Sequence, residues 1–274
     1  MDREPKEGQP RHDLIRFMAG FLLLALLFMP WPRLAMAETL HVAAASNFRS
    51  TFTRLARLFE AQSGHRVLTS YASTGKLYAQ VRAGAPYALF LAADKAYPDR
   101  LRREGLTVGS TVVYALGKLV LWHPEARPIE ERGDTTLPAL EKMQRLAISN
   151  PKTAPYGRAA RETLISLGQW RRMQPRLIYG ENVGQTLTFA ASGNVEAGFV
   201  ALSQVLDEEG DVRGHPWLVP EAHYRPIRQG AVLLRPSERQ PAARTLMAFL
   251  ISAPAREMIR RMGYGTPDLQ EGRE

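Results

Sequence analysis

The stretch "TLHVAAASNFRSTFTRLARLFEAQSGHRVLTSYASTG" (39–75) predicts a strand, a helix and a second strand, in that order. Residues 39–45 form a short apolar run that suits a buried strand. Phenylalanine and leucine residues then recur at helical spacing on one face, and Gly64 ends that helix. The next strand covers 66–71. Because strands and helices alternate, we expect an α/β fold with a mostly parallel, doubly wound sheet.

The same alternation continues along the chain. Short apolar runs predict further strands at 87–93, 118–123, 145–150, 176–180, 197–202 and 231–235. Helical patterns follow several of these strands, and two more helices are expected at 239–251 and 254–262. The polar stretch 207–216 predicts a solvated loop. The pattern stops and restarts once, near residue 115, which indicates two α/β units.

These units predict two lobes. The first lobe is expected to comprise 38–115 together with a C-terminal return, 228–274, and the second to comprise 116–227. The chain would then cross between the lobes twice, near 115–118 and 225–230. Both crossings are candidate hinges.

Residues 1–37 have the pattern of a secretory signal peptide. Basic residues precede the apolar run "FMAGFLLLALLFMPW" (17–31), and Ala35 and Ala37 stand at −3 and −1 of a cut before Glu38. A membrane anchor is the alternative, but the apolar run has only about 14 residues, whereas a spanning helix needs roughly 20. We therefore expect a cleaved leader and a soluble mature protein in the periplasm.

Composition limits the classes of function. The chain has 274 residues and a formal net charge of +9, which attracts anions. The basic residues are scattered and an exported protein rarely meets nucleic acid, so we expect no nucleic-acid partner. The absence of cysteine excludes disulfides, thiolate metal sites, a thiol nucleophile and a lipidated N-terminal cysteine. The histidines show no metal-ligand spacing in a helix, and no serine lies in a nucleophile elbow.

Four predicted strands end in loops of the same kind, each just before a predicted helix. The loops carry Ser46-Asn47, "STG" at 73–75, "APYG" at 154–157 and "GENVGQ" at 180–185. In open α/β sheets ligands bind at this edge, and the unpaired N–H groups of helix N-termini favour an anion there. Gly157 lets the backbone approach a ligand closely. The four loops therefore suggest a single anion site surrounded by hydrogen-bond donors.

Helix capping is the alternative explanation for each loop, because Ser and Asn are favoured N-caps in any helix. Composition alone leaves both explanations open. The acidic residues near the loops are expected to serve the helices, Asp94 as a cap and Glu181 as a first-turn residue. Surface positions are expected for Lys76 and Arg158, and both could raise the local positive potential.

Six segments carry a resemblance to a known family. They are "AAASNF" (43–48), "YASTGKL" (71–77), "GAPYALFLAAD" (84–94), "NPKTAPYGRAA" (150–160), "GENVGQTLTFAASGNVEAGFVALSQ" (180–204) and "MGYG" (262–265). In this order, over most of 38–265, they resemble the periplasmic molybdate-binding proteins of bacterial ABC importers. The resemblance implies the two-lobed periplasmic binding protein fold of type II, with molybdate or tungstate bound in the cleft between the lobes.

The resemblance also implies which residues bind the ligand. In that family neutral hydrogen bonds from hydroxyls and backbone amides hold the oxyanion, with no cofactor, no catalytic residue and no metal contact except through molybdate oxygens. Ser46 and Ser73 fall on the two serines of the family pattern, and Tyr156 and Val183 fall on the backbone amide donors. Some members place a tyrosine where this chain has Ala201. Here Asn47 is expected to contribute instead.

The protonation chemistry of the ligands agrees with a site made of donors only. Molybdate and tungstate are fully deprotonated at neutral pH, whereas phosphate carries a proton that a carboxylate accepts well. None of the four loops has an Asp at its apex. Sulfate is smaller than molybdate and would leave some buried donors unpaired, at about 1–3 kcal/mol each.

The resemblance further implies delivery to a membrane permease of an ABC importer, by a protein that we expect to be monomeric and not an enzyme. Two alternatives stay open. One is a binding protein for sulfate, phosphate or ferric ion, although a ferric site would need paired tyrosine and acidic ligands that the loops lack. The other is an exported enzyme for an anionic substrate, which would need a nucleophile or general base in the cleft.

Overall fold

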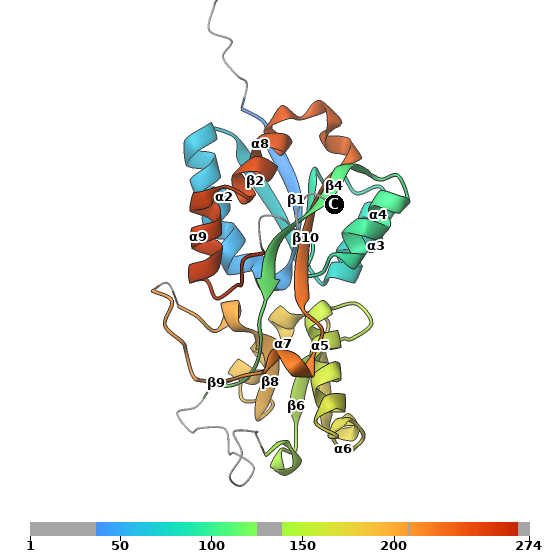
Figure 1. Cartoon of the computed structure of the whole chain (residues 1–274), viewed down its shortest axis with the longest axis vertical. Coiled ribbons are helices and arrows are strands. Elements are labelled where there is room, and N and C mark those ends of the chain that lie inside the picture. Colours follow the sequence, from blue (N-terminus) through green and yellow to red (C-terminus); the bar gives the residue numbers. More distant parts are fainter. Residues whose placement is uncertain (1–36, 125–138, 208, 268–274) are drawn as a thin grey trace, which may run out of the picture. The chain divides into compact units, whose positions relative to one another are not determined.

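The structure, a computed structural model, describes residues 37–124, 139–207 and 209–267. The predicted signal peptide lies outside the described residues, except for Ala37. Two five-stranded sheets, each covered by helices, make up the described part of the chain (Figure 1). No helix within this part is long and apolar enough to cross a membrane.

The first sheet has the strand order β2-β1-β3-β10-β4. Its strands are β1 (Thr39–Ala45), β2 (Arg66–Ala72), β3 (Leu89–Leu91), β4 (Thr107–Gly117) and β10 (Ile227–Leu234). β1 pairs in parallel with β2 and with β3, while β10 pairs antiparallel with β3 and β4. Four of the five strands therefore run in one direction, as predicted, and β10 alone returns.

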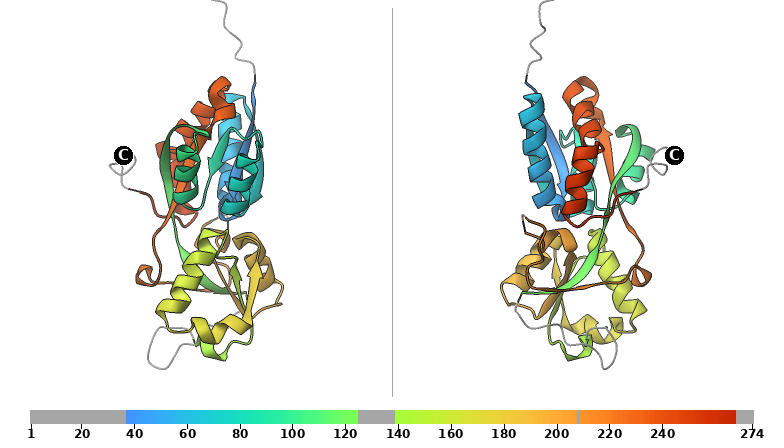
Figure 2. Two further views of the ribbon diagram at one scale, coloured as in Figure 1. Left: turned by 90° about the vertical axis from the view of Figure 1, so that its right-hand side faces the viewer. Right: turned by 60° about the vertical axis from the view of Figure 1, so that its left-hand side comes forward.

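Helices cover both faces of the first sheet. They are α2 (Arg49–Ser63), α3 (Thr74–Arg82), α4 (Ala96–Arg103), α8 (Pro241–Leu250) and α9 (Ala253–Arg261). Side chains alternate along a strand, so Val42 of β1 lies in one core with α2, α8 and α9, and Ala43 lies in another with α3 and α4. Figure 2 shows α2 and α9 side by side on their face.

The second sheet has the strand order β7-β6-β8-β5-β9. Its strands are β5 (Leu119–His123), β6 (Leu146–Ser149), β7 (Leu177–Gly180), β8 (Ala197–Ala201) and β9 (His215–Leu218), and its helices are α5 (Pro155–Ser166), α6 (Trp170–Met173) and α7 (Val183–Ala191). β6 pairs in parallel with β7 and β8, and β5 pairs antiparallel with β8 and β9. The second sheet thus repeats the arrangement of the first.

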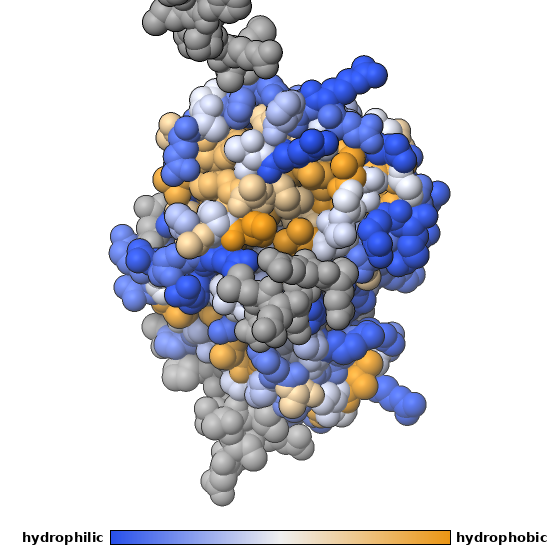
Figure 3. Space-filling model, turned by 45° about the horizontal axis from the view of Figure 1, so that its top comes forward, coloured by the Kyte–Doolittle hydropathy of each residue, from blue (hydrophilic) through white to orange (hydrophobic). Residues whose placement is uncertain are grey.

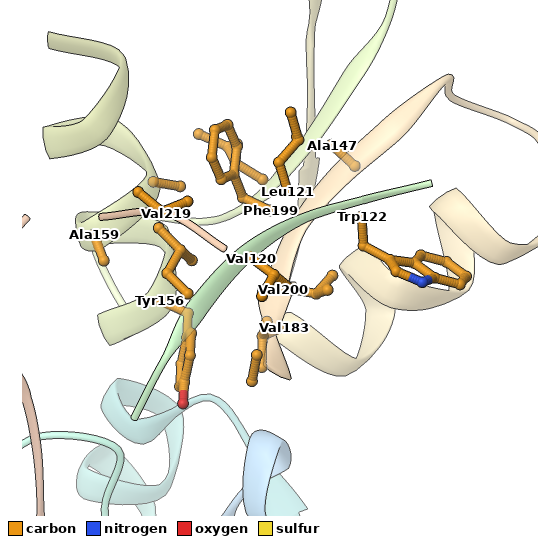
Figure 4. Packing of buried hydrophobic residues seen from close by; sticks show 14 of the residues in the cluster. Val120, Leu121, Trp122, Ala147, Tyr156, Ala159, Val183, Phe199, Val200 and Val219 are labelled. Atoms are coloured by element: carbon orange, nitrogen blue, oxygen red, sulfur yellow. The ribbon is translucent and has the colours of Figure 1, made fainter. Parts of the chain in front are cut away.

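A single buried core holds the second sheet to its helices. Phe199 on the central strand β8 is fully buried there, with Leu121 and Val120 of β5 nearby in Figure 4. Tyr156 lies at the edge of the cluster with its hydroxyl directed away from it (Figure 4). Ala45, at the end of β1, and Ala93, just after β3, belong to the same core, so the two halves share apolar contacts.

Two short 3-10 helices continue strands directly into the junction between the sheets. They are η1 (Ser46–Phe48), which follows β1, and η4 (Leu202–Gln204), which follows β8. Within the described residues, the further 3-10 segments are η2 (Leu140–Lys142), η3 (Gln174–Arg176), η5 (Glu221–His223) and η6 (Arg235–Arg239).

The apolar runs predicted most strands, but two were missed. β4 was not predicted, because glycine and serine interrupt its apolar pattern, and β9 lies partly in the stretch 207–216 that was predicted to be a solvated loop. Cross-strand pairing decides both cases: β4 forms the long ladder with β10, and β9 pairs with β5 at the sheet edge.

The chain passes between the sheets at two places. β4 ends at Gly117 and β5 begins at Leu119, so the first crossing is a single residue. The second lies between the end of β9 at Leu218 and the start of β10 at Ile227. The first sheet therefore reaches slightly past the predicted boundaries at 115 and 228.

Hydrophilic residues are spread over the face shown in Figure 3, around an area of apolar residues. Several large apolar side chains are partly exposed, including Leu58, Leu68 and Ile165. Exposed apolar residues are normal in a folded protein.

Replacing Phe199 by alanine should lower the free energy of unfolding by about 3–5 kcal/mol, because it removes a fully buried aromatic ring from the central strand. Urea denaturation measures the change. Ile165→Ala is the matched control, since that side chain on α5 is 48% exposed and should change stability by less than about 0.5 kcal/mol. Equal effects of the two substitutions would contradict the assigned core.

Candidate functional site

A small, partly open cavity lies between the two sheets, at the ends of their strands. Its volume is about 10 Å3, which is room for about one water molecule. It is lined by Ala45, Ser46, Asn47, Ala72, Thr74, Ala93, Ala154, Pro155, Tyr156 and Val183. Four of the five residues predicted to bind the ligand are in this set. The fifth, Ser73, lies between two lining residues and is itself buried.

Helix N-termini surround the cavity on both sides. Asn47 belongs to η1 and Thr74 opens α3 in the first sheet, while Tyr156 and Val183 lie in the first turns of α5 and α7 in the second. The first N–H groups of a helix have no intrahelical partner, and they carry the positive end of its dipole. The lining therefore has peptide N–H donors from four segments that are far apart in the sequence.

Local sequence explains why these helices begin where they do. Asn182 caps α7, since its Oδ1 accepts a hydrogen bond from the Gln185 N–H at 3.1 Å. Pro155 starts α5, where its missing N–H costs nothing. Gly157 follows, and a Cβ there would lie 2.1 Å from the backbone oxygen of Ser149. Only glycine allows α5 to pack this closely on β6, which holds the start of the helix against the cavity.

Hydroxyl groups add neutral donors. Ser46 and Ser73 are buried, and neither side chain caps its own helix. Thr74 is buried as well, and its Oγ1 accepts a hydrogen bond from the Ala93 N–H at 3.1 Å, so its own proton is free to be donated. Thr74 was not predicted, although its place in the "STG" loop is the same signal that marked Ser73.

The lining contains no Asp, Glu, His, Lys or Arg. Its one ionisable residue is Tyr156, and burial raises the pKa of that phenol well above its usual value near 10. The phenol therefore stays neutral at physiological pH. Among the described residues, no group of three or more His, Asp or Glu side chains could hold a metal ion.

A second, open groove shares Ala93 and Pro155 with the cavity wall. Its basic side chains are Lys95, Arg100, Arg103, Arg158, Arg225 and Arg228, against two acids, Asp94 and Glu162. This excess of positive charge favours anions near the cavity, while the cavity itself offers only dipoles.

Beneath the cavity lies a buried polar network made of Asn47, Tyr114, Tyr156, Ser203, Gln229 and Tyr264. Asn47 Nδ2 donates to Gln229 Oε1 at 3.0 Å and to Tyr264 Oη at 3.2 Å. Gln229 Nε2 donates to Tyr156 Oη at 3.2 Å. Burial raises the pKa of the Tyr264 phenol to about 12, so it too remains a neutral partner. The side-chain N–H groups of Asn47 are thus engaged in the network rather than with the cavity.

Sequence reasoning missed the network apart from Asn47 and Tyr156. A buried glutamine in the apolar strand "IRQGAVLL" (227–234) was the available signal for Gln229. The "MGYG" segment contains Tyr264, which was noted only as part of the resemblance.

Direct contacts close the two halves over the cavity. The Gly75 N–H donates to the Thr153 carbonyl oxygen at 2.9 Å. Lys76 Nζ lies 2.9 Å from Glu181 Oε1, and Arg158 pairs with Asp94. Lys76 and Arg158 therefore join the two halves rather than lining the cavity. Because Lys76 and Glu181 are about half exposed, their pair adds little stability by itself.

The two acidic residues near the loops, Asp94 and Glu181, make different contacts. Asp94 Oδ1 accepts from the Tyr97 N–H at 3.1 Å and so bonds to the first turn of α4, although Lys95 and not Asp94 occupies the N-cap position. The prediction for Glu181 was wrong: α7 begins at Val183 with Asn182 as its cap, so Glu181 precedes the helix. Its carboxylate pairs with Lys76 across the cavity edge instead.

Comparison with known proteins identifies the family. Residues 40–265 match the family model of the bacterial extracellular solute-binding proteins. The chain is 43% identical to the molybdate-binding protein ModA of Azotobacter vinelandii, over 84% of this chain and 91% of that protein. The chain belongs to the ModA family of bacterial solute-binding proteins. It is also 39% identical to ModA of Rhodobacter capsulatus, over 90% of this chain and 96% of that protein.

A solved structure agrees with the family. The periplasmic molybdate-binding protein of Azotobacter vinelandii matches with a TM-score of 0.79 and 36% identity, over 84% of this chain and all of that one. The predicted family and the two-lobed periplasmic binding protein fold of type II are confirmed. Members of this family are substrate-binding proteins of transport systems rather than enzymes.

Replacing Gly75 by alanine should hinder closure. The added Cβ would lie 2.8 Å from Tyr97 Oη and 3.1 Å from the backbone of Thr153 on the opposite half, so the two halves must separate slightly. We expect weaker ligand binding, by about tenfold, with thermal stability of the unliganded protein changed little. Titration calorimetry measures the ligand affinity, and thermal denaturation measures the stability of the unliganded protein. Unchanged affinity would show that this contact is not part of the closed state.

Anion affinity should not depend on pH between about 6 and 9, because the lining has no group that titrates there. Tyr156 has a raised pKa and loses its proton only above this range. Calorimetric titration at several pH values tests this. A loss of affinity as the pH rises through 7 would instead indicate that a histidine supplies positive charge to the anion.

Proposed function

We propose that this protein is a periplasmic receptor that binds molybdate, and also tungstate, between its two lobes and delivers it to the permease of an ABC importer. The observation that carries the proposal is the buried, uncharged cavity lined by the N-terminal turns of four helical segments. The names of the relatives support the ligand, since both Azotobacter vinelandii and Rhodobacter capsulatus ModA are molybdate-binding proteins.

Five residues are proposed to bind the oxyanion. Ser46 and Ser73 would donate from their hydroxyls, and Tyr156 and Val183 from their backbone N–H groups. Asn47 completes the set. All five are buried, so the anion would exchange its water shell for fixed donors that are already oriented.

The same donors account for selectivity. A fully deprotonated tetrahedral anion has acceptors only and can satisfy every donor around it. A protonated phosphate would need an acceptor in the cavity, and none of the lining side chains is a carboxylate. A smaller sulfate would leave donors unpaired, at about 1–3 kcal/mol for each buried group.

Lobe closure is proposed to accompany binding. Lys118 and the segment between Leu218 and Ile227 connect the two sheets, and they are the proposed hinges between a first lobe and a second lobe. The ligand would draw η1 and α3 of the first lobe towards α5 and α7 of the second. The closed surface would then dock on the permease.

Isothermal titration of the purified mature chain with molybdate, tungstate, sulfate and phosphate tests the proposal. We expect one anion per chain for molybdate and tungstate, with little heat from sulfate or phosphate. Binding of sulfate or phosphate in preference to molybdate would indicate that the ligand is another oxyanion. Absence of binding by all four would refute the receptor function.

The double substitution Ser46→Ala and Ser73→Ala should weaken molybdate binding by at least about a hundredfold, because each hydroxyl donates a charge-assisted hydrogen bond. Ser192→Ala is the matched control, since Ser192 is exposed at the end of α7, and its affinity should equal that of the wild type. Retention of full affinity by the double variant would rule out both hydroxyls as ligands.

A further inference from the structure

Gln229 on β10 joins the two lobes behind the cavity. Its side chain is fully buried. On the side of the first lobe its Oε1 accepts from Asn47 Nδ2 at 3.0 Å and from Tyr114 Oη at 2.9 Å. Its Nε2 donates across to Tyr156 Oη of the second lobe at 3.2 Å. Gln229 thus contacts two of the residues proposed to bind the oxyanion, one from each lobe.

This arrangement leaves an acceptor unused. Both N–H bonds of the Asn47 carboxamide point into the network, to Gln229 and Tyr264. Asn47 Oδ1 is buried and has no hydrogen-bond partner among the described residues. An unpaired buried polar atom is unfavourable, and an unpaired oxygen beside an anion site would repel the anion.

The hydrogen bonds of Gln229 are retained if its carboxamide and that of Asn47 both flip, so that the oxygen and nitrogen atoms of each group exchange places. Gln229 Nε2 would then donate to Asn47 Oδ1, and Gln229 Oε1 would accept from the Tyr156 hydroxyl. A phenol both donates and accepts, so Tyr114 would accept from Gln229 and donate to the Ala92 carbonyl oxygen, which lies 3.3 Å away. Each contact exchanges donor and acceptor, and none is lost.

The contacts of Asn47 survive as well. Tyr264 Oη would donate to Asn47 Oδ1 instead of accepting from Nδ2, across the same 3.2 Å. Ser203 Oγ, which now donates to Tyr264 Oη at 2.8 Å, lies 3.3 Å from the Asn47 backbone oxygen and would donate there instead, in place of Tyr264. In this second arrangement every hydroxyl proton of the network has an acceptor. Asn47 Nδ2 alone is left without a partner, at the position where Oδ1 now stands.

We propose that Gln229 is a positioning residue that sets the orientation of the Asn47 carboxamide, and that oxyanion binding selects the arrangement in which Asn47 Nδ2 is free to donate to the anion. Asn47 lines the cavity, so a bound anion would supply the one acceptor that the second arrangement needs. The inference rests on the proposed function, because it requires an oxyanion in the cavity. It adds a residue outside the cavity lining to the determinants of affinity.

Two substitutions of Gln229 distinguish its role in orienting the Asn47 carboxamide from a role in packing. Gln229→Glu places an acceptor-only carboxylate at the centre of the network, which holds Asn47 Nδ2 towards residue 229. Gln229→Met removes the hydrogen bonds and leaves Asn47 able to turn. We expect molybdate affinity to fall in both variants and to fall further in Gln229→Glu, by about ten- to a hundredfold from the wild type. If Gln229 had only a structural role, Gln229→Met would lower the molybdate affinity more than Gln229→Glu, because methionine makes none of the side-chain hydrogen bonds.

The pH profile provides a second readout. As the pH falls from 8 to 5.5, the buried carboxylate of Gln229→Glu gains a proton and can again donate to Asn47 Oδ1. Its affinity should recover over this range, while that of the wild type and of Gln229→Met stays constant. An affinity of Gln229→Glu that equals that of Gln229→Met at every pH would overturn the proposal.

A double-mutant cycle with Asn47→Ala excludes simple repulsion between the new carboxylate and the anion. If Gln229 acts through Asn47, adding Gln229→Glu to Asn47→Ala should lower affinity by much less than it does alone. Additive losses would mean direct repulsion and would contradict the inference. The proposed function is tested separately, by the wild type in the same titrations: failure there would remove both proposals, and additive losses only this one.

Discussion

A buried anion without a counter-charge can be held only by oriented dipoles, and the arrangement of both sheets follows from that constraint. Peptide N–H groups and hydroxyls give a doubly charged anion its hydrogen bonds without bringing a titrating group into the cavity. The parallel strands β1 and β6 each end at the junction between the sheets, and the segments that follow them start there. The positive ends of helix dipoles from both lobes therefore meet at one small cavity.

The charges of the protein lie around this cavity and not in it. The Arg158–Asp94 and Lys76–Glu181 pairs link the halves at its edges, and the basic groove beside it carries the excess positive charge. This separation assigns different tasks to the two kinds of group. In the proposed function, long-range charge raises the local anion concentration, whereas short-range donors with fixed geometry decide which anion remains bound.

Sequence patterns predicted the parts of the fold that depend on local order. The apolar run 39–45 became β1 residue for residue, and the four loops reach the junction between the sheets as expected of strand ends. β4 and β9 were missed because their partners, not their own residues, make them strands. The role of Gln229 was hidden for a similar reason, since its partner Asn47 lies 182 residues away in the chain. Long-range polar contacts leave no periodic signal in a sequence.

The most direct test of the proposed site is a crystal structure of the protein with molybdate, in which anomalous scattering at the molybdenum edge locates the anion. We expect one molybdenum peak in the cavity, with the molybdate oxygens within hydrogen-bond distance of the hydroxyls of Ser46 and Ser73 and the amides of Tyr156 and Val183. A peak in the neighbouring groove, on arginine side chains, would contradict it, because charge rather than oriented dipoles would then hold the anion.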